Sequence, residues 1–94
     1  MFAVKDTPLK PLGYQQITTL TSSTALTVPS HASMALLQAE TQNVRWRDDG
    51  TAPEATVGML IFSGDMGFWY TGNLTAIRFI EATASAKLNV SYYA

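Results

Sequence analysis

The chain has 94 residues, of which 47% are hydrophobic and 14% charged, and its formal net charge is −1. Single domains commonly span about 50–250 residues, and about 25% of a typical domain's residues are charged. The length therefore predicts one domain. The near-neutral charge excludes the basic surface with which proteins bind nucleic acid or anionic membranes. Because the chain has too few charged residues to cover the surface of a small domain, we expect a partner to cover part of its apolar surface.

The chain has no cysteine and one histidine. This composition predicts neither disulfides nor a zinc site, whose ligands are mostly cysteine and histidine. The longest apolar run, residues 58–62, is far shorter than the roughly 20 residues of a membrane-spanning helix. The first residues lack the apolar core of a signal peptide. We expect a chain made in the cytoplasm, without membrane contact or cofactor.

Residues 1–13 are predicted to form an extended amino-terminal arm, because Pro8 and Pro11 lack an N–H group and restrict the residues before them. The arm either lies against its own domain or reaches a neighbour. Residues 14–94 are predicted to form a single domain, which opens with strands at residues 14–21 and 25–28 that are rich in β-branched side chains.

The longest uninterrupted segment, residues 33–47, is predicted to be one strand. If Val44 and Trp46 face inward, strict alternation also buries Glu40 and Gln42, which conflicts with their polarity. A β-bulge near residues 39–43 resolves the conflict.

The second half of the chain reads as short strands separated by turns. The first of them, residues 56–62, is apolar on both faces, so we expect it to be central or covered on both sides. The last, residues 87–93, alternates most cleanly, with Leu88, Val90 and Tyr92 on one face. The other predicted strands are residues 68–71 and 74–81, with a hairpin turn at residues 63–65 and turns at 72–73 and 82–86.

Seven to eight short strands, with turn signals about every 8–12 residues, are typical of all-β domains. We predict a small antiparallel β-sandwich that is either jelly-roll-like or Ig-like. The chain contains no internal repeat and no low-complexity segment.

Residues 44–53 hold the densest run of charge. Arg45 and Arg47 share one strand face, and Trp46 points to the other. Two interpretations remain open, and they are compatible with each other. The arginines form an electropositive patch that binds a neighbour's carboxylate, and one of them pairs with an acidic side chain (Asp48, Asp49 or Glu81) of its own subunit. The sequence Asp48-Asp49-Gly50, followed by Pro53, predicts a tight structural turn with positive φ at the glycine.

Three groups of side chains are of the types that catalysis or metal binding requires. His31 between serines is read as a solvated loop residue, because no nucleophile turn accompanies it. Three aspartates, at positions 48, 49 and 65, would suit calcium, but their spacing is not that of an EF-hand. Glutamates such as Glu40 and Glu81 would suit a hydrolase only if the fold brought two together. We expect no catalytic residue and no metal site.

Aromatic and arginine side chains are enriched in protein interfaces. The sequence offers several of them on strands as candidate subunit-interface residues. These are Arg45, Arg47, Phe68, Trp69, Tyr70, Tyr92 and Tyr93. The alternative function is a carbohydrate- or receptor-binding module that uses Trp69 and Tyr70.

Several short motifs in residues 34–93 resemble those of small structural proteins of tailed bacteriophages. The resemblance implies a non-enzymatic β-sandwich protein of the virion. The first expectation is a capsid decoration protein, and the second is a head–tail or tail component. It also implies homo-oligomers and partners among virion proteins, such as the major capsid subunit. The motifs are Gln38-Ala39-Glu40, Val44-Arg45-Trp46-Arg47-Asp48-Asp49-Gly50-Thr51-Ala52-Pro53, Gly58-Met59, Ser63-Gly64-Asp65, Tyr70-Thr71-Gly72, Leu74-Thr75-Ala76-Ile77-Arg78-Phe79-Ile80 and Leu88-Asn89-Val90-Ser91-Tyr92-Tyr93.

Overall fold

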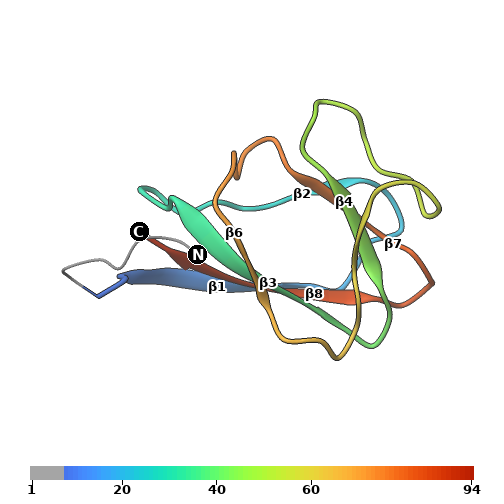
Figure 1. Ribbon diagram of the computed structural model, residues 1–94, viewed down its shortest axis with the longest axis horizontal. Coiled ribbons are helices and arrows are strands. Elements are labelled where there is room, and N and C mark those ends of the chain that lie inside the picture. The colour runs from blue at the N-terminus through green and yellow to red at the C-terminus, as the bar shows by residue number, and fades with distance from the viewer. Residues whose placement is uncertain (1–7) are drawn as a thin grey trace.

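The computed structural model describes residues 8–94, which form eight strands in two antiparallel sheets of four strands each (Figure 1). The prediction of an all-β fold is confirmed. Within the described residues, no helix has the length and apolar character needed to cross a membrane. The strands are β1 Pro11–Ile17, β2 Thr24–Ala25, β3 Met34–Glu40, β4 Val44–Arg47, β5 Met59–Ile61, β6 Phe68–Tyr70, β7 Arg78–Glu81 and β8 Lys87–Tyr93.

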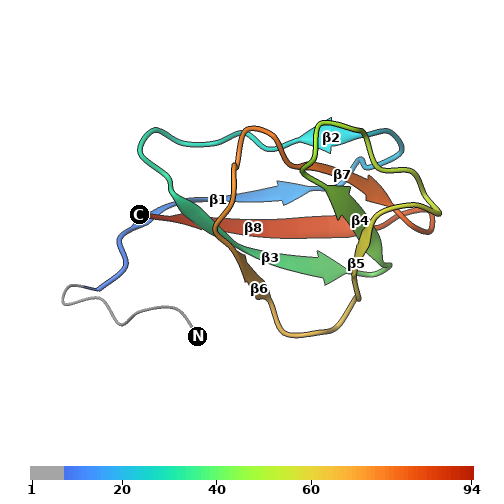
Figure 2. The same ribbon diagram turned by 45° about the horizontal axis from the view of Figure 1, so that its top comes forward.

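The strand pairing is nested. Strand β1 pairs with β8, β2 with β7, β3 with β6 and β4 with β5, always antiparallel. Additional pairing of β8 with β3 and of β7 with β4 completes the sheet orders β1-β8-β3-β6 and β2-β7-β4-β5. Figure 2 shows the resulting arrangement, in which β5 and β6 are end strands of different sheets.

The two sheets share one hydrophobic core. The predicted alternation in β8 is confirmed, since Leu88, Val90 and Tyr92 are at most 1% exposed. Full burial of such side chains stabilises the fold by about 1.5–3 kcal/mol each. The hydroxyl group of Tyr92 donates a hydrogen bond to Gln15 Oε1 at 2.7 Å, so its polar end is satisfied.

Residues 33–47 are not one bulged strand, and that prediction was wrong. Strand β3 ends at Glu40, and β4 begins at Val44 in the other sheet. Thr41 has a φ of +77° at the corner between them. The Asn43 side chain accepts a hydrogen bond from the Ser63 backbone N–H at 2.9 Å. The change of sheet, rather than an extra residue within one strand, resolves the conflict in side-chain alternation.

The prediction of a central strand at residues 56–62 was also wrong. Strand β5 has three residues and lies at the end of its sheet, with only Ile61 buried. A strand with apolar residues on both faces can be a covered strand or an apolar edge strand, so its composition does not distinguish the two positions. Residues 63–65 do not form a hairpin turn, because they lie on the connection from β5 to β6 in the other sheet.

The remaining strands are shorter than predicted or shifted. Strand β7 begins only at Arg78, and β2 has two residues. Strand β1 begins at Pro11, inside the range assigned to the arm. A proline is tolerated there because β1 is an edge strand. Lys10 and Ala94 exchange backbone hydrogen bonds of 2.9 and 3.0 Å just before it, so residues 10–13 lie against their own domain. Residues 1–7 of the predicted arm lie outside the described residues.

Candidate functional site

Trp46 lies where the two sheets meet at their β5 and β6 edges. It follows Val44 on the inward face of β4, as predicted, but it is only half-buried, whereas Val44 is fully buried. Its ring lies 6.1 Å from that of Phe68 and 5.8 Å from that of Tyr70, measured between centroids. Trp46 therefore joins β4 in one sheet to β6 in the other.

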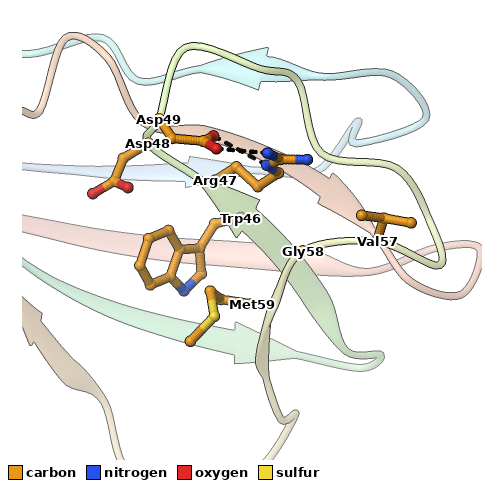
Figure 3. Close-up of a pocket in the computed structure, with 7 residues that line it drawn as sticks. All are labelled: Trp46, Arg47, Asp48, Asp49, Val57, Gly58 and Met59. Carbon is orange, nitrogen blue, oxygen red and sulfur yellow. Dashed lines mark hydrogen bonds and ion pairs between the residues drawn. The ribbon is translucent and has the colours of Figure 1, made fainter.

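Two open hollows flank Trp46. One has a volume of about 410 Å³ and extends from the Arg47 side of Trp46 to Val57 (Figure 3). The other has a volume of about 310 Å³ and extends along β5 to Met66 and Phe68. The hollows adjoin, because Trp46 and Met59 line both of them.

The surface around these hollows is unusually apolar. Five of the six large hydrophobic side chains that the described residues expose lie within residues 57–66, and their exposed fractions range from 38% at Leu60 to 92% at Met66. No charged residue occurs between Glu54 and Asp65. We call this region the β5-edge surface. It comprises Trp46, Val57, Met59, Leu60, Phe62, Met66 and Phe68.

Strand β5 is protected as an edge strand by its shortness alone. Natural edge strands are blunted by being very short, by charged side chains, by prolines or by bulges. Strand β5 reads Met59-Leu60-Ile61, so it is short but has no charge, no proline and no bulge. Contiguous exposed apolar patches mark sites of protein–protein interaction or ligand binding, so this surface is the candidate site.

Arg45 holds the long loop between β4 and β5. Its Nε donates to the Ala55 carbonyl oxygen at 2.9 Å, and its Nη1 donates to the Gly58 carbonyl oxygen at 2.8 Å. The Arg45 guanidinium is therefore directed to the backbone of its own chain. It positions the residues from which β5 begins.

The chain reverses through this loop rather than at a tight Asp48-Asp49-Gly50 turn, so that prediction needs correction. The tight turn is at residues 54–57, where Glu54 and Val57 exchange backbone hydrogen bonds of 2.9 and 3.0 Å. The expected positive φ of Gly50 is confirmed at +89°. Pro53 is buried in the loop, and its Cβ atom would lie 3.3 Å from a Cβ atom added at Gly58.

Arg47 pairs with Asp49 on the rim of the larger hollow (Figure 3). Its Nε donates to Asp49 Oδ1 at 3.0 Å, and its Nη2 contacts Oδ2 at 2.5 Å. The hydrogen bond from Arg47 lowers the pKa of Asp49, and the same bond raises the pKa of Arg47. The interpretation of an ion pair within the subunit is confirmed. Both guanidinium groups therefore have partners within their own chain.

Two predicted interface residues are core residues instead. Tyr70 is 7% exposed and Tyr92 is 1% exposed. Both face inward because they pair across the sheet with Ala35, whose side chain is fully buried. Burial raises the pKa of each tyrosine to about 12, and at Tyr70 a hydrogen bond to Asp48 adds to the effect.

Of the remaining aromatic candidates, Phe68 belongs to the β5-edge surface. Trp69 and Tyr93 lie together elsewhere, with ring centroids 5.1 Å apart in an edge-to-face arrangement. Trp69 pairs across the sheet with Leu36, whose neighbours in β3 are both buried. Because successive strand residues face opposite sides, Trp69 and Tyr93 lie on the outer face of the β1-β8-β3-β6 sheet. The five aromatic residues predicted for an interface are thus divided among three places: the core, the β5-edge surface and the outer sheet face.

Sequence reasoning missed most of the β5-edge surface, because residues 56–62 were read as a covered strand. The signal that would have found it is the absence of charge between Glu54 and Asp65 in a chain of low charge. The exposed residues that were missed are Val57, Met59, Leu60, Phe62 and Met66.

The side chains considered for catalysis or metal binding do not come together. Glu40 accepts a hydrogen bond from Asn89 at 3.0 Å, and Glu81 accepts one from the Ser85 backbone at 3.1 Å; they lie in different sheets. His31 is exposed in a loop with a φ of +71°. Within residues 8–94, no three histidine, aspartate or glutamate side chains are grouped to hold a metal ion.

Comparisons with protein-family models, curated protein sequences and solved structures gave no significant match. Function is therefore inferred from the fold, from the β5-edge surface and from the resemblance described above.

Proposed function

We propose that this protein is a non-enzymatic structural subunit that binds other protein subunits through the β5-edge surface. The observation that carries the proposal is the cluster of exposed apolar side chains on an uncharged edge strand. Burying apolar area contributes about 25 cal/mol per Å², before the costs of association are subtracted. A small domain with few charges gains more from such a contact than a highly charged domain would.

The proposed setting is the virion of a tailed bacteriophage, where the protein binds the major capsid subunit as a decoration protein or else a head–tail or tail subunit. The resemblance of residues 34–93 to small phage structural proteins supports this setting. Many copies on a symmetric shell would bind with avidity even if each contact were weak.

The proposed fold type is a jelly-roll β-sandwich rather than an Ig-like one. The nested pairing of β1 with β8, β2 with β7, β3 with β6 and β4 with β5 supports it. Jelly rolls have eight strands in two sheets and occur in viral capsid proteins, but also in lectins and cupins. The fold is therefore compatible with the proposed function and does not by itself establish it.

The test starts from purified virions of the phage that encodes the chain. Mass spectrometry should find the protein in the particles, and purified protein should rebind to particles depleted of it. Phe62→Ser is expected to weaken rebinding at least about tenfold through loss of buried apolar area. Tyr14→Ser changes a side chain of similar exposure, 66% against 52%, away from β5 and should bind normally. Absence of the protein from virions, or equal binding of both variants, would overturn the proposal.

One observation favours a second candidate function, a carbohydrate-binding module. Trp69 and Tyr93 form an aromatic pair on an outer sheet face, whereas Tyr70, the other residue expected in this role, is buried. Glycan-array binding that Trp69→Ala abolishes and Phe62→Ser leaves unchanged would favour this alternative over the subunit role.

A further inference from the structure

The Asp49-Gly50 sequence combines an acidic side chain with the least hindered backbone nitrogen that can follow it. A glycine has no side chain to obstruct contact between its own amide nitrogen and the carboxyl group of the residue before it. The other three aspartates of the chain precede threonine, aspartate or methionine, and no asparagine precedes glycine. Attack of the backbone on a neighbouring side chain is therefore favoured at residues 49–50 over every other position in the sequence.

The structure leaves both reacting groups accessible. The Asp49 side chain is 56% exposed, and Gly50 is exposed as well. Within residues 8–94, the Gly50 N–H group donates no hydrogen bond. Gly50 has a φ of +89°, and a Cβ atom added to it would meet nothing within 4 Å. Neither a hydrogen bond nor a packed neighbour in this part of the chain therefore restrains the Gly50 nitrogen.

We propose that Asp49-Gly50 is a site of spontaneous isoaspartate formation and that the ion pair between Arg47 and Asp49 restrains this reaction. In the first step, the Gly50 nitrogen bonds to Cγ of the protonated Asp49 carboxyl group. The hydroxyl group leaves from Cγ and combines with the amide proton as water, and a five-membered succinimide ring results.

The second step is hydrolysis of the succinimide by solvent water. Addition of water at Cγ restores aspartate. Addition at the main-chain carbonyl carbon of residue 49 gives isoaspartate, in which the chain runs through Cγ and the former main-chain carbonyl carbon becomes the free carboxylate. One water is released and one is consumed, so the modification is an isomerisation without oxidation, reduction or a change in mass.

Arg47 restrains the reaction because it keeps the Asp49 carboxyl group ionised and in place. The first step expels a hydroxyl group, which only the protonated acid carries. Arg47 Nε donates to Asp49 Oδ1 at 3.0 Å, and Nη2 contacts Oδ2 (Figure 3), so the contact is bidentate. The hydrogen bond from Arg47 is the main cause of the lowered pKa of Asp49. The reactive acid is therefore scarce while the pair is intact.

Isomerisation would alter the rim of the larger hollow, which Arg47 and Asp49 both line. The isoaspartate linkage adds one methylene group to the main chain and leaves the carboxylate attached directly to Cα. The shortened side chain is then no longer placed to contact both Nε and Nη2 of Arg47. Because Arg45 binds the carbonyl oxygens of Ala55 and Gly58, we expect the change to be confined to residues 48–53.

The first test is ageing of the purified full chain in neutral buffer, followed by proteolysis and electron-transfer fragmentation, which distinguishes isoaspartate from aspartate. We expect isoaspartate to accumulate at residue 49. Asp65 is the internal control, because it is also exposed but precedes methionine. Asp49→Glu keeps the charge but would have to form a six-membered ring, so it should abolish the signal. No isoaspartate at residue 49, or as much at residue 65, would overturn the assignment of the site.

The second test compares the ageing of two arginine variants. Arg47→Met is expected to raise the rate at residue 49 roughly two- to fivefold, the factor by which an exposed ion pair shifts an equilibrium. The matched control is Arg78→Met. Arg78 lies opposite Arg47 in β7, but its side chain donates to the carbonyl oxygens of Thr75 and Ile77, so the wild-type rate is expected.

Thermal unfolding of Arg47→Met and Arg78→Met checks that both variants are folded. Neither ageing test involves a binding partner, so their results are independent of the proposed subunit role. Equal rates of isoaspartate formation in the two variants would overturn the restraint by Arg47.

Discussion

The hydroxyl group of Tyr70 donates a hydrogen bond to Asp48 Oδ2 at 2.7 Å. Tyr70 ends β6 in one sheet, whereas Asp48 directly follows β4 in the other. Gly72 leaves the ring just enough room, because a Cβ atom there would lie 2.6 Å from Tyr70 Cζ. The bond therefore ties the two sheets together beside Trp46, at the edge where the candidate site lies.

Removal of this hydroxyl should weaken the fold. Tyr70→Phe is expected to lower the free energy of unfolding by about 1 kcal/mol, the usual net contribution of one hydrogen bond. Urea denaturation measures the change. Asp48→Asn keeps a side-chain oxygen as acceptor and should cost less than Tyr70→Phe. A Tyr70→Phe variant as stable as the wild type would show that the bond contributes nothing.

Alkaline pH should destabilise the protein through its two buried tyrosines. The pKa values of Tyr70 and Tyr92 are raised from 10.0 to about 12, chiefly by burial. Both states hold these protons below pH 10. Between about pH 10 and 12 the unfolded state loses them first, so stability falls as pH rises, by up to about 1.4 kcal/mol per pH unit for each tyrosine. Urea denaturation at several pH values measures this slope. Tyr70→Phe should roughly halve it, and an unchanged slope would contradict the assignment.

The two arginines of β4 should behave differently. Arg45→Met keeps the aliphatic stem but loses two hydrogen bonds to loop carbonyl oxygens, and we expect a loss of about 1.5–3 kcal/mol with faster hydrogen exchange in residues 48–58. Arg47→Met removes an exposed ion pair with Asp49, so its effect should be small and should diminish with added salt. Equal effects of the two substitutions would refute the loop-anchoring role of Arg45.

Gly58 should tolerate substitution less well than Gly50. Both have positive φ, but a Cβ atom at position 50 would meet nothing within 4 Å, whereas one at position 58 would lie 3.1 Å from the Trp46 carbonyl oxygen and 3.3 Å from Pro53 Cβ. Gly50→Ala is expected to cost about 1–2 kcal/mol from backbone strain alone. Gly58→Ala should cost more, because crowding adds to strain. Melting temperatures compare the two, and the reverse order would contradict this prediction.

Much of the fold was predictable where neighbouring residues decide the outcome. The alternation of Leu88, Val90 and Tyr92 predicted the buried face of β8, and the aromatic run predicted β6. The candidate site was less predictable. Tyr70 was expected at an interface and is buried, whereas Met59 was expected to be covered and is 60% exposed. An aromatic or aliphatic residue is equally suited to a core and to an interface, so its identity does not distinguish them.

The sequence by itself determined the all-β class, the short strands and the positive φ of Gly50, because side-chain alternation and glycine's conformational freedom act over a few residues. Only the tertiary structure decided that β3 and β4 belong to different sheets and that β5 lies at an edge. Those outcomes depend on pairings such as β1 with β8, between residues more than 70 positions apart. The exposure of the β5-edge surface follows from this nested pairing, since the hairpin strand β5 is left without a second neighbour within the described part of the chain.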